Sequence, residues 1–320
     1  MYPKAYLELS LSDSVSKLKE AYWRAISKLE AKRKSRIFSI IHCGENDNHI
    51  CGPTFWNVFS HRSHVKKIET LELLIHSPGG SADIAYQLVK FFRRHCQRFN
   101  VIVPLTAKSA ATLMCLGADG IYMGEFADLG PIDVQIQDPL EKGAKSISPL
   151  DEFKSAEFLR DYAVEILDFF TALIIRRSGM GVKEALRESV PFTTGIMRPL
   201  YEQLDPLEIG EYKRSLAIGA DYAIRLLALT KNPRQKEIVE SLVSQYPSHG
   251  FVIDPSEARG LGLPVHLLEP AQENVLLPAL ENIINSGESI YGFAKVPPKK
   301  AAAQKTKGAP VSAPKPLAVA

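Results

Sequence analysis

The sequence predicts an α/β protein with a mostly parallel sheet and a large helical C-terminal part. Apolar runs of strand length alternate with helical patterns in the first half of the chain, at residues 36–42, 70–76, 99–105 and 120–123. This alternation is typical of parallel strands joined by helices. With 320 residues, of which 45% are hydrophobic and 23% charged, the chain can bury a substantial core.

An amphipathic helix is expected before the first strand, over residues 12–34. Its basic end suits a helix C-terminus. Apolar side chains at helical spacing form one stripe, which we expect to pack on a partner subunit. The stripe consists of Val15, Leu18, Tyr22, Ile26 and Leu29.

A second long helix is expected to begin at Ser148 and Pro149, which suit an N-cap and a first turn, and to stop at Gly179. Further helical patterns fill residues 182–246. The rest of the fold reads as a short strand at 251–253, a helix in SEARGLGL and a strand at 264–269. From Val296 onward Pro, Ala and Lys predominate, so we expect a disordered tail. The predicted division is an N-terminal helix (1–34), a main domain (35–295) and a tail (296–320).

The charge distribution gives no reason to expect a nucleic-acid partner. Six lysines lie in residues 295–320, which contain no acid, and removing them from the net charge of +3 leaves −3 for the rest. Phosphate binding needs a clustered basic face, which a mildly acidic body lacks.

The chain is expected to stay in the cytoplasm. Its start lacks the basic and apolar regions of a secretory signal. Its most apolar segment, residues 162–175, carries Glu165 and Asp168 and is shorter than the roughly 20 apolar residues of a membrane helix. Four cysteines without a CxxC pair suit a reducing compartment.

The strand TLELLIH runs into Ser77-Pro78-Gly79-Gly80 and then into a helical segment. Two glycines at the end of a buried strand let the backbone turn sharply and present N–H groups to an incoming oxygen. Hydrolysis of an amide needs such donors. Taken alone, the same pattern also fits a plain turn between a strand and a helix.

A second turn of this kind follows the next strand and carries Ser109 among small residues, in AKSAAT. Small neighbours let a substrate carbonyl approach, and a helix N-terminus favours developing negative charge. Ser109 is therefore placed like a nucleophile, although a serine here is also a common helix N-cap. Lys108, beside it, is expected to point away or to anchor the turn. Two such turns separated by one helix favour chemistry over capping.

The series HSPGG, AKSAATLMCLGAD, IYMG and LGPIDVQ resembles the serine dehydrogenase proteinase family, a cytoplasmic relative of signal peptide peptidase A and of the Clp protease. Ala118 and Asp119 follow Ser109 by nine and ten residues, as in that group, and SEARGLGLPV is similar to its closing segment. The match is strong over 36–140 and moderate over 248–270.

This resemblance implies a Clp/crotonase-like fold of repeated ββα units and a catalytic main domain. It implies Ser109 as the nucleophile and the amides of Gly80 and Ala110 as the oxyanion hole, with Gly79 in support.

The same resemblance leaves the general base open. Clp proteases use a histidine about twenty-five residues after the serine, but residues 96–248 contain no histidine. Signal peptide peptidases use a lysine, and Lys154, forty-five residues after Ser109, is the best match. Such a lysine must be desolvated to lose its proton. Lys142, Lys145 and His249 are the alternatives, and Lys154 can equally be a solvated surface lysine.

Other candidate side chains have structural explanations. Asp133 can bind the lysine or shape the substrate groove, or it can cap a turn. His249 can approach the site or bond the local backbone. The donors of His42, Cys43, His49 and Cys51 suggest zinc, but the adjacent first pair lacks the usual ligand spacing, so no metal is expected.

The expected function is that of a cytoplasmic serine endopeptidase that acts through an acyl-enzyme without a cofactor. No GxxxxGK[ST] motif is present, so hydrolysis is expected to be independent of ATP. The partners are a peptide or protein substrate and further copies of the chain. Two alternatives remain: an acyl-CoA enzyme of the crotonase type with the same oxyanion hole, and an inactive scaffold that binds peptides.

Overall fold

The computed structural model describes residues 4–43, 49–64, 68–132, 149–248 and 250–294. Within these ranges the side chains of residues 4–14, 149–154 and 212 are not described. The predicted tail, residues 296–320, lies outside the described residues.

A six-stranded sheet forms the centre of the molecule, in the order β7-β5-β3-β2-β1-β8. All neighbouring strands are parallel except β8, which runs antiparallel to β1 at the edge. The mostly parallel sheet confirms the predicted fold class. The strands are β1 (Arg36–Ile41), β2 (Ile68–His76), β3 (Cys96–Val103), β5 (Gly120–Met123), β7 (Val265–Leu267) and β8 (Ile290–Phe293).

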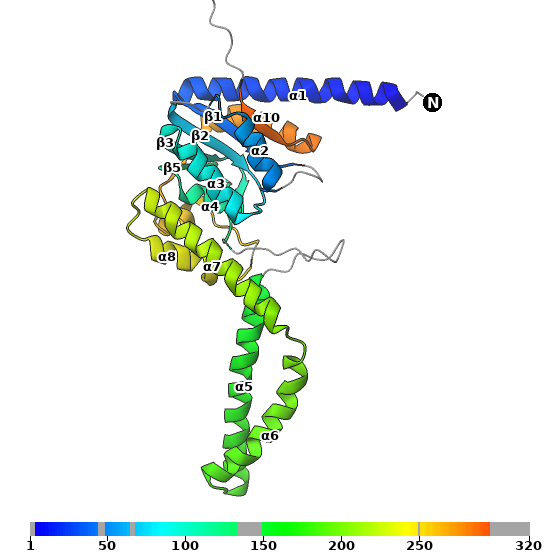
Figure 1. Ribbon diagram of the computed structural model, residues 1–320, viewed down its shortest axis with the longest axis vertical. Helices are drawn as coiled ribbons and strands as arrows, with labels where there is room; N and C mark the ends of the chain where they lie inside the picture. The colour runs from blue at the N-terminus through cyan, green and yellow to red at the C-terminus, as the bar shows by residue number, and fades with distance from the viewer. Residues whose placement is uncertain (1–3, 44–48, 65–67, 133–148, 249, 295–320) are drawn as a thin grey trace, which may run out of the picture.

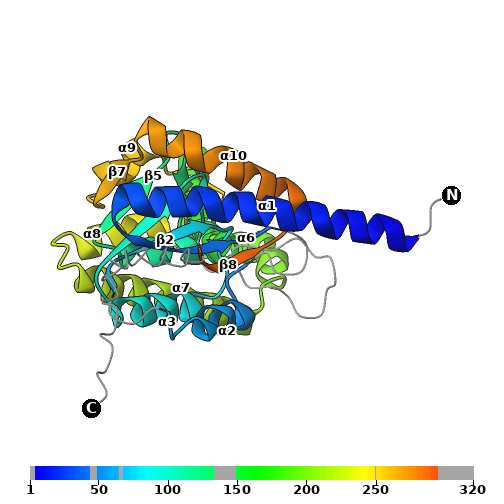
Figure 2. The same cartoon turned by 90° about the horizontal axis from the view of Figure 1, so that it is seen from above.

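Helices cover both faces of the sheet, as Figure 2 shows from above. On one face lie α2 (Gly52–Ser60), α3 (Ala82–Arg93), α4 (Ala110–Leu116), α7 (Pro206–Leu229), α8 (Gln235–Glu240) and the π-helical turn η1 (Ser241–Gln245). On the other lie α1 (Lys4–Arg33) and α10 (Pro270–Ser286). The short helix α9 (Pro255–Gly260) precedes β7.

The two faces explain why the central strands are apolar throughout. In β2, Leu71, Leu73 and Ile75 enter the core under α2, α3 and α4, whereas Leu74 enters the core under α1 and α10. A strand buried on both faces needs apolar residues at nearly every position. The sequence therefore shows continuous apolar runs at β1, β2 and β3.

The C-terminal half of α1 packs within its own chain. Tyr22, Ile26 and Leu29 are fully or almost fully buried against α10 and the sheet. The Tyr22 hydroxyl donates a hydrogen bond to Ser39 Oγ of β1 at 2.8 Å. The apolar stripe expected on this helix is thus used inside the chain over this half, and an argument for a partner subunit has to come from another surface.

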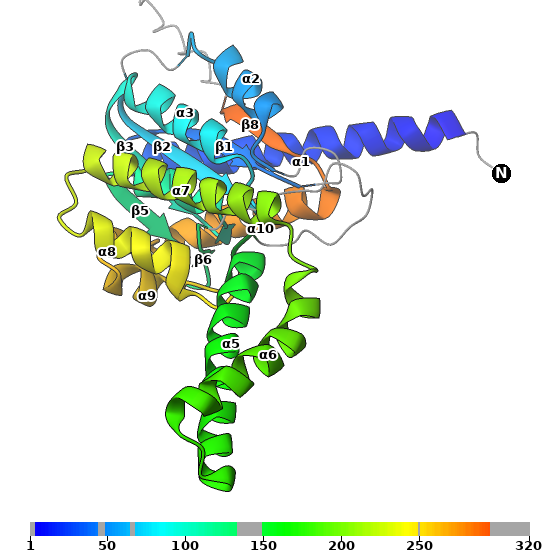
Figure 3. The same ribbon diagram turned by 60° about the horizontal axis from the view of Figure 1, so that its bottom comes forward.

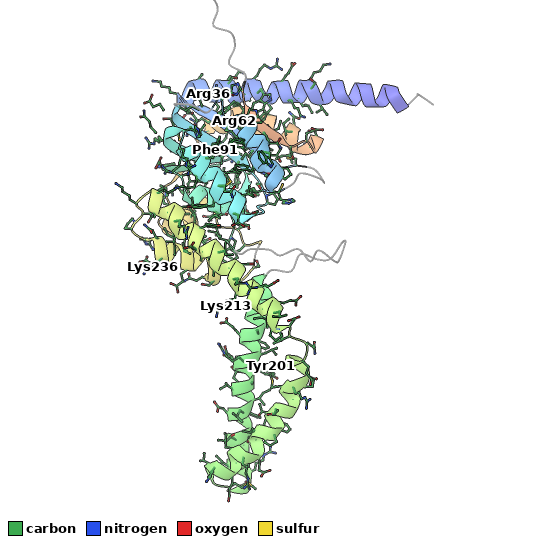
Figure 4. The ribbon with its side chains drawn as sticks, viewed as in Figure 1. Arg36, Arg62, Phe91, Tyr201, Lys213 and Lys236 are labelled. Atoms are coloured by element: carbon green, nitrogen blue, oxygen red, sulfur yellow. The ribbon has the colours of Figure 1, made fainter. Side chains whose placement is uncertain are left out.

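Two long helices, α5 (Pro149–Ser178) and α6 (Val182–Tyr201), form a hairpin that projects from the body (Figures 1 and 3). α7 follows the hairpin and leads the chain back over the sheet. Large apolar side chains on the hairpin are exposed, including Tyr201, which Figure 4 labels near the end of α6. The others are Phe158, Tyr162, Val164, Phe169, Met180, Val182, Leu186, Val190, Phe192 and Ile196.

The prediction of a strand at residues 251–253 is wrong, because these residues form no strand. Ile253 instead forms one isolated antiparallel bridge to Leu129. Leu129 belongs to β6 (Asp128–Leu129), which pairs in parallel with β4 (Thr106–Ala107) to form a separate two-stranded sheet. In the described part of the chain, no helix is both long and apolar enough to cross a bilayer.

Candidate active site

The two glycine- and serine-bearing turns lie side by side because they follow neighbouring parallel strands, β2 and β3. A bridge between Ser77 and Ala107 ties them together. The Ser77 amide donates to Thr106 O at 3.1 Å, and the Lys108 amide donates to Ser77 O at 3.0 Å. These hydrogen bonds hold the backbones of Ser77 and Lys108, and with them the two turns, in one network.

Gly79 and Gly80 have φ values of +114° and +137°, a region that side chains other than hydrogen strongly disfavour. A Cβ on Gly79 would lie 2.7 Å from Ser109 Cβ. A Cβ on Gly80 would lie 2.2 Å from Ile50 O. Both positions need glycine, because the turn touches the serine on one side and the Ile50 backbone on the other.

Ser109 has a strained backbone at the N-terminus of α4, with φ +50° and ψ −116°. This conformation is costly for a residue other than glycine and is typical of a nucleophile on a sharp turn between a strand and a helix. Ser109 occupies the N-cap position of α4, but its side chain makes no capping hydrogen bond to the helix. Ser109 is 7% exposed, and the seven residues of α4 that follow it are all buried.

The backbone N–H groups of the two turns differ in whether they have a hydrogen-bond acceptor. The Gly79 amide donates to Ser77 Oγ at 3.1 Å. No described residue accepts a hydrogen bond from the amide of Gly80 or of Ala110. These two N–H groups flank the closest approach of the turns and are available to an oxygen of a bound molecule.

The Lys108 side chain anchors the turn, as the sequence predicted. Its ammonium lies 2.5 Å from Asp128 Oδ2 and donates to Leu129 O at 3.1 Å and Phe251 O at 2.9 Å. Three acceptors use all three of its N–H bonds. Asp128 also accepts a hydrogen bond from the Thr106 hydroxyl. The Asp128 carboxylate of β6 therefore binds both Thr106 of β4 and Lys108, the residue before Ser109.

The segment after β6 is fixed to α4 by Thr112. Its hydroxyl donates to Ala107 O at 2.7 Å and accepts from the Gly130 amide at 3.1 Å. The start of LGPIDVQ is thereby held against the helix that begins after Ser109.

The structure does not describe the side chains of the other predicted site residues. Asp133, Lys142, Lys145 and His249 lie outside the described residues. Lys154 lies in the second turn of α5, whose first residues are next to the body in Figure 1, and its side chain is not described.

A side chain that the sequence analysis assigned only to a metal hypothesis lies directly behind the glycine turn. His42 Nδ1 is 2.8 Å from Ser77 Oγ, and His42 is 4% exposed. Burial, with further contributions from His49 and His76, lowers the pKa of His42 to about 4, so its imidazole is neutral at pH 7. Both residues follow the carboxyl ends of adjacent parallel strands, and this shared position was the signal available in the sequence. Among the described residues, no cluster of three or more His, Cys, Asp or Glu side chains could hold a metal ion.

Similar proteins were found in sequence and in structure. Two uncharacterised proteins of Methanocaldococcus jannaschii are 26% and 23% identical to this chain over 280 and 290 residues, which are 85% and 88% of this chain and 82% and 84% of theirs. A mutant of the membrane-bound stomatin-specific protease 1510-N matches with a TM-score of 0.27 and 15% identity, covering 48% of this chain and 68% of that one.

The model of one protein family, described as the ClpP-like SDH-type serine proteinases, matches residues 5–176. The match covers more than half of the chain and includes both turns and α4. It confirms the Clp-type fold and the serine peptidase class that the sequence predicted. The chain belongs to the family of ClpP-like SDH-type serine proteinases.

Proposed function

We propose that the chain is a serine endopeptidase in which Ser109 attacks the substrate carbonyl and becomes acylated. The observation that carries this proposal is the strained backbone of Ser109, directly against a glycine turn. Strain of this kind persists where the surrounding structure enforces it, and it clusters at reactive residues.

The oxyanion hole is assigned to the amides of Gly80 and Ala110. Both N–H groups lack an acceptor among the described residues, and Ala110 is the first residue of α4, where the helix dipole favours negative charge. When Ser109 Oγ bonds to the carbonyl carbon, the π electron pair moves to the carbonyl oxygen. Two preorganised donors stabilise that charge as it develops.

The general base is assigned to Lys154. Its neutral amine would take the proton of the Ser109 hydroxyl and later give it to the leaving amine, after which water hydrolyses the acyl-enzyme. In this proposal Lys154→Arg is as inactive as Lys154→Ala, because arginine does not lose its proton in the working range. A fully active arginine variant would move the base to Lys142, Lys145 or His249.

The proposal also covers the substrate, the assembly, the location and the domain bounds of the protein. The substrate is a peptide or protein, hydrolysis needs no ATP, and the chain acts as a homo-oligomer in the cytoplasm. The catalytic domain is residues 35–295, between the N-terminal helix and the tail. The exposed apolar residues of the α5–α6 hairpin support an oligomer.

A fluorophosphonate probe tests the proposal. Ser109 Oγ would bond to phosphorus, fluoride would leave, and the hydroxyl proton would pass to the base. We expect labelling of the wild type and none of Ser109→Ala, with labelling retained in Ser63→Ala, which changes an exposed serine of the loop after α2. An unlabelled wild type would favour the two alternatives, a crotonase-like acyl-CoA enzyme or an inactive peptide-binding scaffold.

A further inference from the structure

We propose that His42 and Ser77 are positioning residues that hold the Gly79–Gly80 turn in the orientation in which the Gly80 N–H faces the reacting oxygen. The inference rests on the proposed role of that amide. It concerns two buried side chains that the mechanism above does not use.

The turn needs such a clamp because two consecutive glycines offer little resistance to rotation of the peptide planes. Both have positive φ, yet glycine occupies negative φ about as readily. A rotated plane would point a carbonyl oxygen where the oxyanion needs a donor. Residues outside the turn must therefore fix each plane.

Each of the two planes has its own partner. The Ile50 amide donates to Gly79 O at 2.6 Å, and the Gly80 N–H belongs to the same peptide unit. In a trans peptide the C=O and N–H point in opposite directions, so this bond turns the Gly80 N–H away from Ile50. The preceding plane contains the Gly79 N–H, which donates to Ser77 Oγ at 3.1 Å.

The Ser77 hydroxyl can hold the Gly79 amide only if its own proton is directed elsewhere. Ser77 is completely buried, and its other hydrogen-bond partner is His42 Nδ1 at 2.8 Å. The hydroxyl oxygen has two lone pairs, but among the described residues His42 Nδ1 is the one acceptor within reach of its proton, so we assign Ser77 as the donor to Nδ1 while it accepts from Gly79. The relay runs from the Gly79 N–H through Ser77 to His42.

This direction of bonding fixes the tautomer of His42. Nδ1 must carry a lone pair and Nε2 the proton. Nε2 is buried and finds no hydrogen-bond partner among the described residues, so it does not compete for the tautomer through a second bond. The titratable groups that act electrostatically on the ring are His49 and His76 of β2, and the ring of Tyr291 of β8 packs edge-on against it with centroids 5.6 Å apart.

The labelling kinetics of the fluorophosphonate probe test the clamp. Ser77→Ala removes the acceptor of the Gly79 N–H, and His42→Leu removes the acceptor of the Ser77 proton. We expect the maximal labelling rate, kinact, to fall about 10- to 100-fold in each, because loss of one oxyanion donor costs roughly that factor or more. The half-saturating probe concentration, KI, should stay within about twofold.

Conservative variants separate positioning from general damage. Ser77→Thr keeps the hydroxyl, and His42→Asn keeps an acceptor close to Nδ1, so both should regain most of kinact. A folded Ser77→Ala protein with unchanged kinact would overturn the inference. An unlabelled wild type would instead overturn the proposed function, so the two failures are distinguishable.

A measurement on the wild type keeps the inference testable if the variants do not fold. In a protein labelled with ¹⁵N-histidine, the His42 ring should show a protonated Nε2 and an unprotonated Nδ1 near pH 7. The opposite tautomer, or a charged ring, would exclude the relay. Two-dimensional spectra that correlate both ring nitrogens with the ring protons distinguish these states.

Discussion

At the residue scale, Ser109, the proposed nucleophile, is held in a backbone conformation that costs stability. Its φ of +50° suits glycine better than serine. Gly79 packs closely on the turn, since a Cβ at this position would lie 2.7 Å from Ser109 Cβ and 2.8 Å from Lys108 O. The strain is therefore a fixed property of the folded state.

We predict that Ser109→Gly is more stable than Ser109→Ala by about 1 kcal/mol, although both lack the proposed nucleophile. Glycine relieves strain of about 1–3 kcal/mol but gains roughly 0.5–1 kcal/mol of unfolded-state freedom. Urea unfolding measures the difference. At Ser63, which has an ordinary φ, the same pair should show the glycine variant as the less stable one. Equal stabilities of the two Ser109 variants would argue against strain.

The lowered pKa of His42 predicts an acid-sensitive fold. The imidazole titrates near 6.5 when unfolded and near 4 when folded, so between these values the unfolded state binds more protons. Stability is therefore full above about pH 6.5 and is lost as the pH falls toward 4, by on the order of 3 kcal/mol. Urea unfolding across this range should show a smaller loss in His42→Asn than in the wild type. Parallel curves would assign the sensitivity to other groups, such as His76, whose pKa burial also lowers.

The site residues divide into those that the sequence could predict and those it could not. Gly79, Gly80, Ser109 and Ala110 lie within two short motifs, so local turn chemistry together with the family resemblance singled them out as candidates. His42 could not be paired with Ser77 in the same way, because thirty-five residues separate them and only the register of β1 with β2 brings them together.

At the scale of elements, α1 is attached to the sheet by a buried ion pair as well as by its apolar stripe. Arg33 donates two hydrogen bonds of 2.6 Å to Glu72 of β2, and the side chains are 9% and 2% exposed. Ser35 also donates to Glu72, at 2.6 Å, and the Arg33 guanidinium lies 4.0 Å from the centre of the Tyr122 ring. The carboxylate thus compensates a charge that the helix carries into the interior.

Glu72→Ala is predicted to destabilise the fold by about 3–5 kcal/mol, because it leaves the Arg33 charge buried without its carboxylate partner. The double variant Glu72→Leu with Arg33→Met should recover most of this loss, since an apolar pair removes both charges. Chemical denaturation of the two variants and the wild type checks the prediction. A double variant as unstable as Glu72→Ala would mean that lost packing, not the orphaned charge, sets the cost.

The elements that the sequence analysis missed share a physical cause. In α2, α10 and β8 a Pro, a Gly or mixed polar residues interrupt the apolar pattern, as Pro278 does inside α10 and Gly292 inside β8. Tertiary contacts decide these segments: β8 pairs with β1, and α10 packs on α1. The continuous apolar runs of β1, β2, β3 and β5 and the long helical pattern of α5 were predicted because local pattern and global fold agree there.

At the scale of the whole molecule, the exposed apolar surface of the α5–α6 hairpin predicts self-association. Isolated apolar side chains are normal on a surface, but this projecting hairpin exposes many of them along two adjacent helices. Nothing else in the described part of the chain presents such a run on a single projecting element.

Light scattering should show an oligomer at micromolar concentration, and Phe169→Glu should lower its mass. Phe169 is 63% exposed, so the substitution places a charge on the surface without disturbing the core. Gln203→Glu adds the same charge at an exposed polar position after α6 and should leave the mass unchanged. A monomeric wild type would contradict the prediction.

The bridge between Ser77 and Ala107 has a mechanical consequence. Because the Ser109 turn and the glycine turn are joined across the two central strands, we expect them to move with the sheet as one rigid body. The sheet is the most buried part of the molecule, so its shape responds little to forces applied at the surface. Control of this protein by assembly or by temperature is therefore expected to act on access to the turns, through the helices around them, rather than on the geometry of the turns themselves.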